Sequence, residues 1–256
     1  MALWSATNWR SIISPSTTTG GAASGRKPCC AGITGFSGRS TPPLAVRLAE
    51  EAGFLYDLEC YVLRRAVRDM AVLRRTLGRP LKTCVNVTVP TFYEGAFEAF
   101  LGELIADGSV GRNELWIEIT EQKALLSDRE TEAKSRRIRA MGFPLVIDDF
   151  SMGHTSIKYL QNSAFDMVKL DGSLVRGLKD NPRCGEIIAT IVSLSRALDF
   201  TVLGECVETK EQQSLLERLG CTQYQGYLYS PAVPFEDFLV LARESSPREK
   251  GEAGKR

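Results

Sequence analysis

Residues 144 to 149 read PLVIDD, a short apolar run that ends in the adjacent acids Asp148 and Asp149. A run of this length and composition predicts a buried strand. Five further runs have the same character and are separated by helical patterns. They are CVNVTV (84 to 89), LWIEIT (115 to 120), DMVKLD (166 to 171), TVLGEC (201 to 206) and TQYQGY (222 to 227).

The clearest helical patterns cover residues 55 to 75, 91 to 108, 129 to 142 and 185 to 199. Strands that alternate with helices indicate an α/β fold whose parallel strands are joined by crossover helices. Such a fold is either an open doubly wound sheet or a closed eight-stranded barrel. The pattern alone does not choose between them.

The composition is that of a globular protein. The chain has 256 residues, 43% hydrophobic and 25% charged, and a formal net charge of +1. This balance gives no reason to expect binding to a DNA or RNA polymer or to an anionic membrane. Seven cysteines without a CxxC pair suit reduced thiols in a cytoplasmic protein. No apolar run approaches the roughly 18 residues of a membrane span.

Polar residues lie in or just after the predicted strands. Because the carboxyl ends of parallel strands converge on one mouth, oxygen ligands from several strands could surround hard divalent cations there. Each residue alone also has a structural explanation, such as a helix cap for Asp149 or an ion pair for Lys169. The residues concerned are Asn86, Glu118, Asp148, Asp149, Lys169, Glu205 and Glu208.

Seven segments in this order resemble the EAL-domain family of cyclic-di-GMP phosphodiesterases, from about residue 38 to residue 244. They are STPPLAVRLAEEAGF, VNVTV, IEITE, VIDDFSMGHTSIKYL, VKLDGSLV, GECVET and QGYLYSPAVP. The resemblance implies a TIM-like (β/α)8 barrel with one antiparallel strand. It also implies hydrolysis of cyclic-di-GMP to linear pGpG with two cations, Mg²⁺ or Mn²⁺.

The resemblance also implies residue roles. The metal residues would be Asn86, Glu118, Asp148, Asp149 and Glu205. Lys169 would orient or polarise the attacking water, with Glu205 and Glu208 completing the catalytic set. Glu208 would tether the loop after Asp149, and Gln225 would line the substrate site.

The chain departs from the family pattern at several positions. The loop usually written DDFGTGYSS reads DDFSMGHTS here, and this loop couples metal binding to a homodimer in the family. Gly172 replaces a usual arginine, and Pro231 with Ala232 replaces Arg-Pro. These last two changes remove candidate phosphate contacts.

The Glu-Ala-Leu motif that names the family is absent, and RKPCCAG (26 to 32) stands in its place. Read from the third base of the Arg26 codon, codons for this peptide can spell Glu-Ala-Leu-Leu-Arg-Trp. In the same frame, SIISP (11 to 15) can spell Tyr-His-Gln-Pro, which resembles the start of the family's preceding strand. Residues 1 to 37 are therefore interpreted as a disordered or out-of-frame leader. The alternative is a genuine leader, or a thiol metal site at Cys29 and Cys30.

This interpretation predicts a barrel domain over residues 38 to 244 that lacks its first two strands, followed by a disordered polar tail over 245 to 256. It also removes one metal-ligating glutamate. We therefore expect an impaired phosphodiesterase, with two alternatives. One is an inactive domain that binds the nucleotide or a protein, and the other is a barrel enzyme of a different reaction class.

Overall fold

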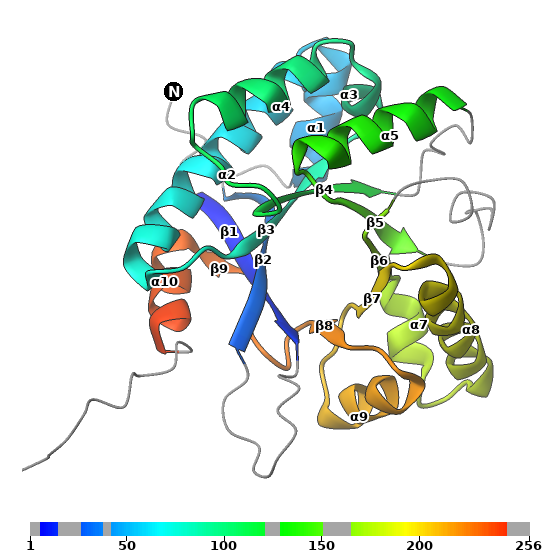
Figure 1. Ribbon diagram of the computed structural model, residues 1–256. Helices are drawn as coiled ribbons and strands as arrows, with labels where there is room; N and C mark the ends of the chain where they lie inside the picture. The colour runs from blue at the N-terminus through cyan, green and yellow to red at the C-terminus, as the bar shows by residue number, and fades with distance from the viewer. Residues whose placement is uncertain (1–5, 15–26, 38–41, 121–128, 151–164, 245–256) are drawn as a thin grey trace, which may run out of the picture.

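The computed structural model describes residues 6–14, 27–37, 42–120, 129–150 and 165–244. Six parallel strands, β3 to β8, form most of one sheet (Figure 1). All six lie where the sequence predicts strands. Their bounds are β3 Lys82–Val87, β4 Leu115–Thr120, β5 Leu145–Phe150, β6 Met167–Leu170, β7 Thr201–Gly204 and β8 Gln223–Gln225.

Two strands from the N-terminal segment close this sheet into a ring. β1 (Ala6–Ser14) is antiparallel to β2 (Lys27–Ser37) and to β8, while β2 is parallel to β3. The short strand β9 (Val233–Pro234) pairs with β1. β1 is thus the single antiparallel member of the eight-stranded ring that the EAL resemblance implies.

These two strands correct one part of the sequence prediction. The barrel type is as expected, but residues 6–14 and 27–37 are extended and paired rather than disordered. The two positions expected to be missing from the barrel are therefore filled. The physical reason is that β3 and β8 would otherwise present unpaired N–H and C=O groups at two open edges, and any extended segment can satisfy them.

Helices cover the outside of the ring (Figure 1). They are α1 Pro42–Glu51, α2 Leu55–Leu77, α3 Val89–Tyr93, α4 Phe97–Ala106, α5 Arg129–Met141, α7 Gly172–Gly177, α8 Pro182–Leu198, α9 Lys210–Leu219 and α10 Phe235–Glu244. No helix among the described residues is long and apolar enough to cross a membrane.

The predicted helix over 91 to 108 is split into α3 and α4. Glu94 leaves the helical conformation, with φ −58° and ψ 131°, and Gly95 follows it. The Glu94 carbonyl, released from the helix, accepts a hydrogen bond of 3.1 Å from the buried Lys134 ammonium on α5. The break therefore joins two neighbouring crossover helices.

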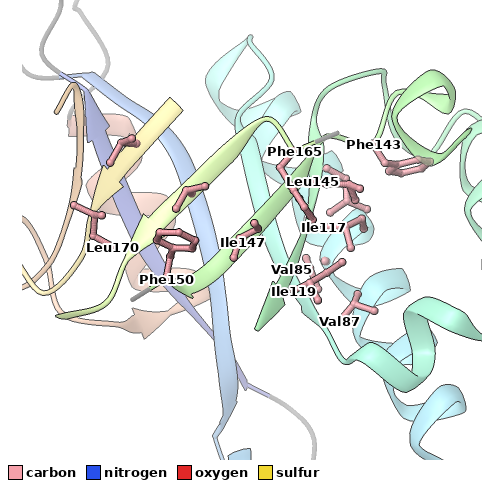
Figure 2. Packing of buried hydrophobic residues seen from close by; sticks show 14 of the residues in the cluster. Val85, Val87, Ile117, Ile119, Phe143, Leu145, Ile147, Phe150, Phe165 and Leu170 are labelled. Carbon is pink, nitrogen blue, oxygen red and sulfur yellow. The ribbon is translucent and has the colours of Figure 1, made fainter. Parts of the chain in front are cut away.

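Alternation along the strands separates two layers of apolar side chains. One set packs under the helices and includes Val85, Ile117 and Ile147 (Figure 2). Because successive strand residues point to opposite faces, the other set points into the ring. This inner layer consists of Cys84, Trp116, Val146, Met167 and Leu203, all buried. It forms an apolar floor beneath the polar residues that come two positions later on the same strands.

Candidate metal centre at the mouth of the barrel

The polar cluster follows the apolar floor because each of its residues lies two positions after a floor residue. Asn86 on β3 and Glu118 on β4 are directly paired in the strand register. Asp148 on β5, Lys169 on β6 and Glu205, just after β7, continue the series around the ring. Alternation and parallel pairing alone therefore bring five of the predicted site residues to one side of the sheet.

Lys169 lies at the centre of this cluster and is only 4% exposed. Its Nζ atom is 2.7 Å from Glu118 Oε1, 3.0 Å from Glu205 Oε1 and 3.4 Å from Asp148 Oδ1. Burial alone would lower the pKa of Lys169, but these three carboxylates raise it well above its usual range. The lysine is thus held as a buried ammonium ion.

The acids of the cluster carry more negative charge than this one ammonium neutralises. Burial, and then the charges of Asp148 and Glu205, raise the pKa of Asp149 to about 6. Burial is also the main cause that raises the pKa of Glu118, to which Asp148 and Glu205 add while Lys169 opposes them. Raised pKa values on neighbouring acids indicate a site that lacks positive charge.

A divalent cation fits this deficit. Ligand oxygens of Asp148, Asp149 and Glu205 lie within 4.8 Å of one another. Asp148 Oδ1 is buried and has an ion pair to Lys169 but no hydrogen-bond partner among the residues that the structure describes. Hard cations bind carboxylate oxygens, and such ions often supply the largest local charge in a site. The donor set therefore suits a metal of the Mg²⁺, Mn²⁺ or Ca²⁺ type.

The backbone is unusual at two positions of the site. Asp149 and Cys206 both adopt the left-handed conformation, each with φ 54°. This conformation is uncommon for residues other than glycine, and strained backbone is often found at functional sites. Asp149 is the last but one residue of β5, and Cys206 lies two residues after the end of β7.

The other predicted site residues occupy different positions. Gln225 on β8 is buried, and its Oε1 atom has no hydrogen-bond partner among the described residues. Glu208 is exposed, and its backbone N–H donates to Gln212 Oε1. The loop that Glu208 is predicted to tether, including Ser151, Met152 and His154, lies outside the described residues. Asn86 is exposed at the mouth.

The sequence analysis missed one acid at this site. Asp171 follows β6, and its charge contributes to the raised pKa of Asp149. Its side chain also accepts a hydrogen bond of 2.7 Å from the Ser173 amide at the start of α7. The available signal was its spacing, because Lys169 and Asp171 are two residues apart and share one side of the strand.

The glycine of QGY positions Gln225. A Cβ atom on Gly226 would lie 2.2 Å from the Val207 carbonyl oxygen, so only glycine allows this approach. The Val207 amide in turn donates to the Gln225 carbonyl at 3.0 Å. The end of β8 is thereby held against the segment that follows Glu205.

Comparisons with known proteins agree with this geometry. The sequence profile of the EAL domain matches residues 37–232. The cyclic di-GMP phosphodiesterase RocR of Pseudomonas aeruginosa is 30% identical over 194 residues, covering 73% of this chain and 50% of RocR. The cyclic di-GMP phosphodiesterase NbdA of the same organism is 30% identical over 205 residues, covering 79% of this chain and 26% of NbdA. The chain thus spans half or less of the length of these curated relatives.

Two solved structures have the same fold. The PaMucR phosphodiesterase in complex with c-di-GMP superposes with a TM-score of 0.77 at 25% identity, covering 91% of this chain and 98% of that one. The manganese and cy-diGMP complex of Klebsiella pneumoniae BlrP1 gives a TM-score of 0.73 at 21% identity, covering 90% and 56%.

Proposed function

The chain belongs to the EAL-domain family, and from that premise we propose that its barrel mouth binds cyclic-di-GMP and hydrolyses it, with impaired efficiency, to linear pGpG. The observation that carries the proposal is the Lys169 ammonium at the centre of Glu118, Asp148 and Glu205. These groups come from β4, β5, β6 and the segment just after β7, and they meet at one mouth of the barrel. Two of them, Asp148 and Glu205, also belong to the cluster of oxygen ligands suited to a metal.

The residues proposed to hold the cations are Asp148, Asp149 and Glu205, with Glu118 and Asn86 on the neighbouring strands. We propose Mg²⁺ or Mn²⁺ as the ion. When bound, a pair of such ions lowers the pKa of a water ligand and offsets negative charge at the phosphorus centre.

The chain's own groups would supply orientation and proton control. Lys169 has three N–H donors, and its fixed position allows it to direct one of them at a water molecule in the mouth. Gln225 offers a buried Oε1 acceptor that has no hydrogen-bond partner in the described part of the chain. It is therefore suited to accept a hydrogen bond from the substrate or from a water molecule. Glu208 is proposed to act on the loop after Asp149.

The impairment follows from the strand beside β3. β2 reads KPCCAGITGFS and contains no acid, so it cannot provide the carboxylate that the family motif supplies. The loss of one ligand lowers cation affinity, and metal-assisted hydrolysis is sensitive to ligand geometry. The same observation favours a second candidate function, in which the domain binds the nucleotide or a protein without cleaving it.

Two further features stay proposals. A homodimer through the loop after Asp149 is expected from the resemblance, and that loop lies outside the described residues. The cytoplasmic location expected from the cysteine usage also stays a prediction.

The deciding experiment measures binding and cleavage on the same sample. The chain is incubated with cyclic-di-GMP and Mn²⁺, the products are separated by chromatography, and binding is measured by titration calorimetry. Linear product that disappears in Glu205→Gln supports the enzyme. Binding without product supports the non-catalytic candidate. If the chain neither binds nor cleaves the nucleotide, the proposed function is wrong.

A further inference from the structure

Three residues share one small volume at the ends of β6 and β7. Gly172 begins α7 directly after Asp171, and Cys206 directly follows Glu205. A Cβ atom on Gly172 would lie 2.5 Å from Cys206 Sγ and 2.8 Å from Arg176 Nη1. Both the thiol and the guanidinium group therefore lie over the bare Cα of Gly172.

Helix geometry explains how Arg176 reaches this place. Residues 172 and 176 are four apart in α7, so they lie on the same face of the helix, and helical side chains lean toward the N-terminus. The N-terminal end of α7 follows β6 at the mouth of the barrel. The Arg176 side chain thus runs back along the helix toward the site, and the missing side chain of Gly172 leaves room for its end.

Cys206 narrows that room from the other side. It adopts φ 54°, a conformation that favours glycine, yet it carries a side chain that projects over Gly172. A larger residue at position 172 would collide with both neighbours. The small residue at 172 and the larger one at 206 are therefore matched to each other.

The charge of Arg176 is not neutralised by any other residue in the described part of the chain. Within the part of the chain that the structure describes, Arg176 has no ion-pair partner, and it is exposed. Lys169, in contrast, forms ion pairs with three carboxylates. An arginine in this position is suited to an external anion, and its planar guanidinium group binds phosphate through two parallel hydrogen bonds.

We propose that Arg176 contacts a phosphate of the bound cyclic dinucleotide, and that the Gly172 and Cys206 pair holds its guanidinium group at the mouth of the site. This inference rests on the proposed function for its ligand. The family usually has arginine at position 172. In this chain the inference assigns phosphate binding to Arg176, one helical turn later.

The first test measures the binding of cyclic-di-GMP by titration calorimetry in Ca²⁺, with chromatography to confirm that the nucleotide stays intact. Arg176→Ala is expected to weaken binding about tenfold, and Arg176→Lys less, because lysine keeps the charge but not the paired hydrogen bonds. Arg218→Ala, an exposed arginine on α9, is the matched control and is expected to bind like the wild type.

A rescue variant separates ligand contact from a structural role. In the Arg176→Ala background, the double change Gly172→Arg with Cys206→Gly makes room for a guanidinium group from position 172, and binding is expected to recover. Gly172→Arg without the change at 206 is expected not to recover, because its Cβ collides with the thiol.

The outcomes are distinct. Weaker binding in Arg176→Ala, restored by the double change, supports the inference. If Arg176→Ala binds like the wild type, this inference is overturned while the proposed function stands. If the wild type itself does not bind the dinucleotide, the proposed function and this inference fail together.

Discussion

The parallel strands β3 to β8 and the hairpin of β1 and β2 contribute to one ring of backbone hydrogen bonds, but they differ in the side chains they bring to the mouth. The parallel strands and the residues just after them supply Asn86, Glu118, Asp148, Lys169 and Glu205. Neither hairpin strand contains an aspartate or a glutamate. Closing the ring needs only extended backbone, because every residue except proline offers the same N–H and C=O groups. The chemistry needs particular side chains at particular positions.

The largest expected effect comes from giving the hairpin the side chains it lacks. Residues 11 to 37 are replaced by a peptide of the proposed shifted frame, with Tyr-His-Gln-Pro at its start and Glu-Ala-Leu-Leu-Arg-Trp in place of RKPCCAG. We expect hydrolysis of cyclic-di-GMP to rise by at least about a hundredfold, since even residues that only support metal ligands change activity by about 10 to 100 fold. The measurement is the rate of linear product formation with Mn²⁺.

The control for this replacement carries the same peptide with glutamine in place of its glutamate. It should fold equally well and stay slow. If the unmodified chain already hydrolyses as fast as the replaced one, the argument from the missing carboxylate is wrong. Sequencing of the gene across the codons for residues 11 to 38 tests the origin of the peptide independently.

The second prediction concerns the parallel strands, and it is tested by a substitution of Lys169. Lys169→Met removes the Lys169 ammonium group from a buried set of carboxylates, and loss of one partner from such a pair costs about 3–5 kcal/mol. We expect a lower free energy of unfolding in urea at pH 8 without metal, and a larger stabilisation by added Mg²⁺ than in the wild type. Lys179→Met is the control, because its pair with Glu211 is exposed and is worth less than about 1 kcal/mol. Equal losses in the two variants would contradict the central role of Lys169.

A third effect concerns the turn that follows β3. The buried Glu59 carboxylate on α2 accepts hydrogen bonds from the Thr88 amide at 3.0 and 3.2 Å and from the Thr88 hydroxyl. Glu59→Ala leaves that amide without its acceptor, so we expect a loss of about 1–3 kcal/mol. Thr88 lies two residues after Asn86, so the loss should also weaken binding of divalent cations.

The pH dependence of this loss has a definite sign. Burial raises the pKa of Glu59, and the hydrogen bonds from the Thr88 amide and hydroxyl only partly oppose it. A carboxyl group with a raised pKa in the folded state stabilises the protein fully below its unfolded pKa, and this stabilisation is lost as pH rises through the folded pKa. The difference between wild type and Glu59→Ala in urea unfolding should therefore be larger at pH 4 than at pH 8. The opposite trend would show that the hydrogen bonds outweigh burial.

Particular residues show what the sequence could and could not predict. Strand alternation was enough to place Glu118, Asp148 and Lys169 together, because spacing and parallel pairing set which side of a sheet a residue faces. The split at Glu94 could not be predicted, since it depends on Lys134, 40 residues later in the chain, donating a hydrogen bond to the released carbonyl. The pairing of residues 6–14 and 27–37 was also missed. It depends on the open edges of β3 and β8 rather than on any pattern within those segments.

The smallest expected effect lies at the seam between the two parts of the ring. The register of β1 against β8 covers only 12–13 and 224–225, whereas that of β3 against β4 runs over 83–87 and 115–119. Regions with short ladders open more easily than the rest of a sheet. In native-state hydrogen exchange we expect amides of β1 to exchange at least about tenfold faster than those of β4, a difference of about 1.4 kcal/mol in opening free energy. Equal protection would mean that β1 opens no more easily than the parallel strands. The two parts of the ring would then differ in the missing carboxylate and not in stability.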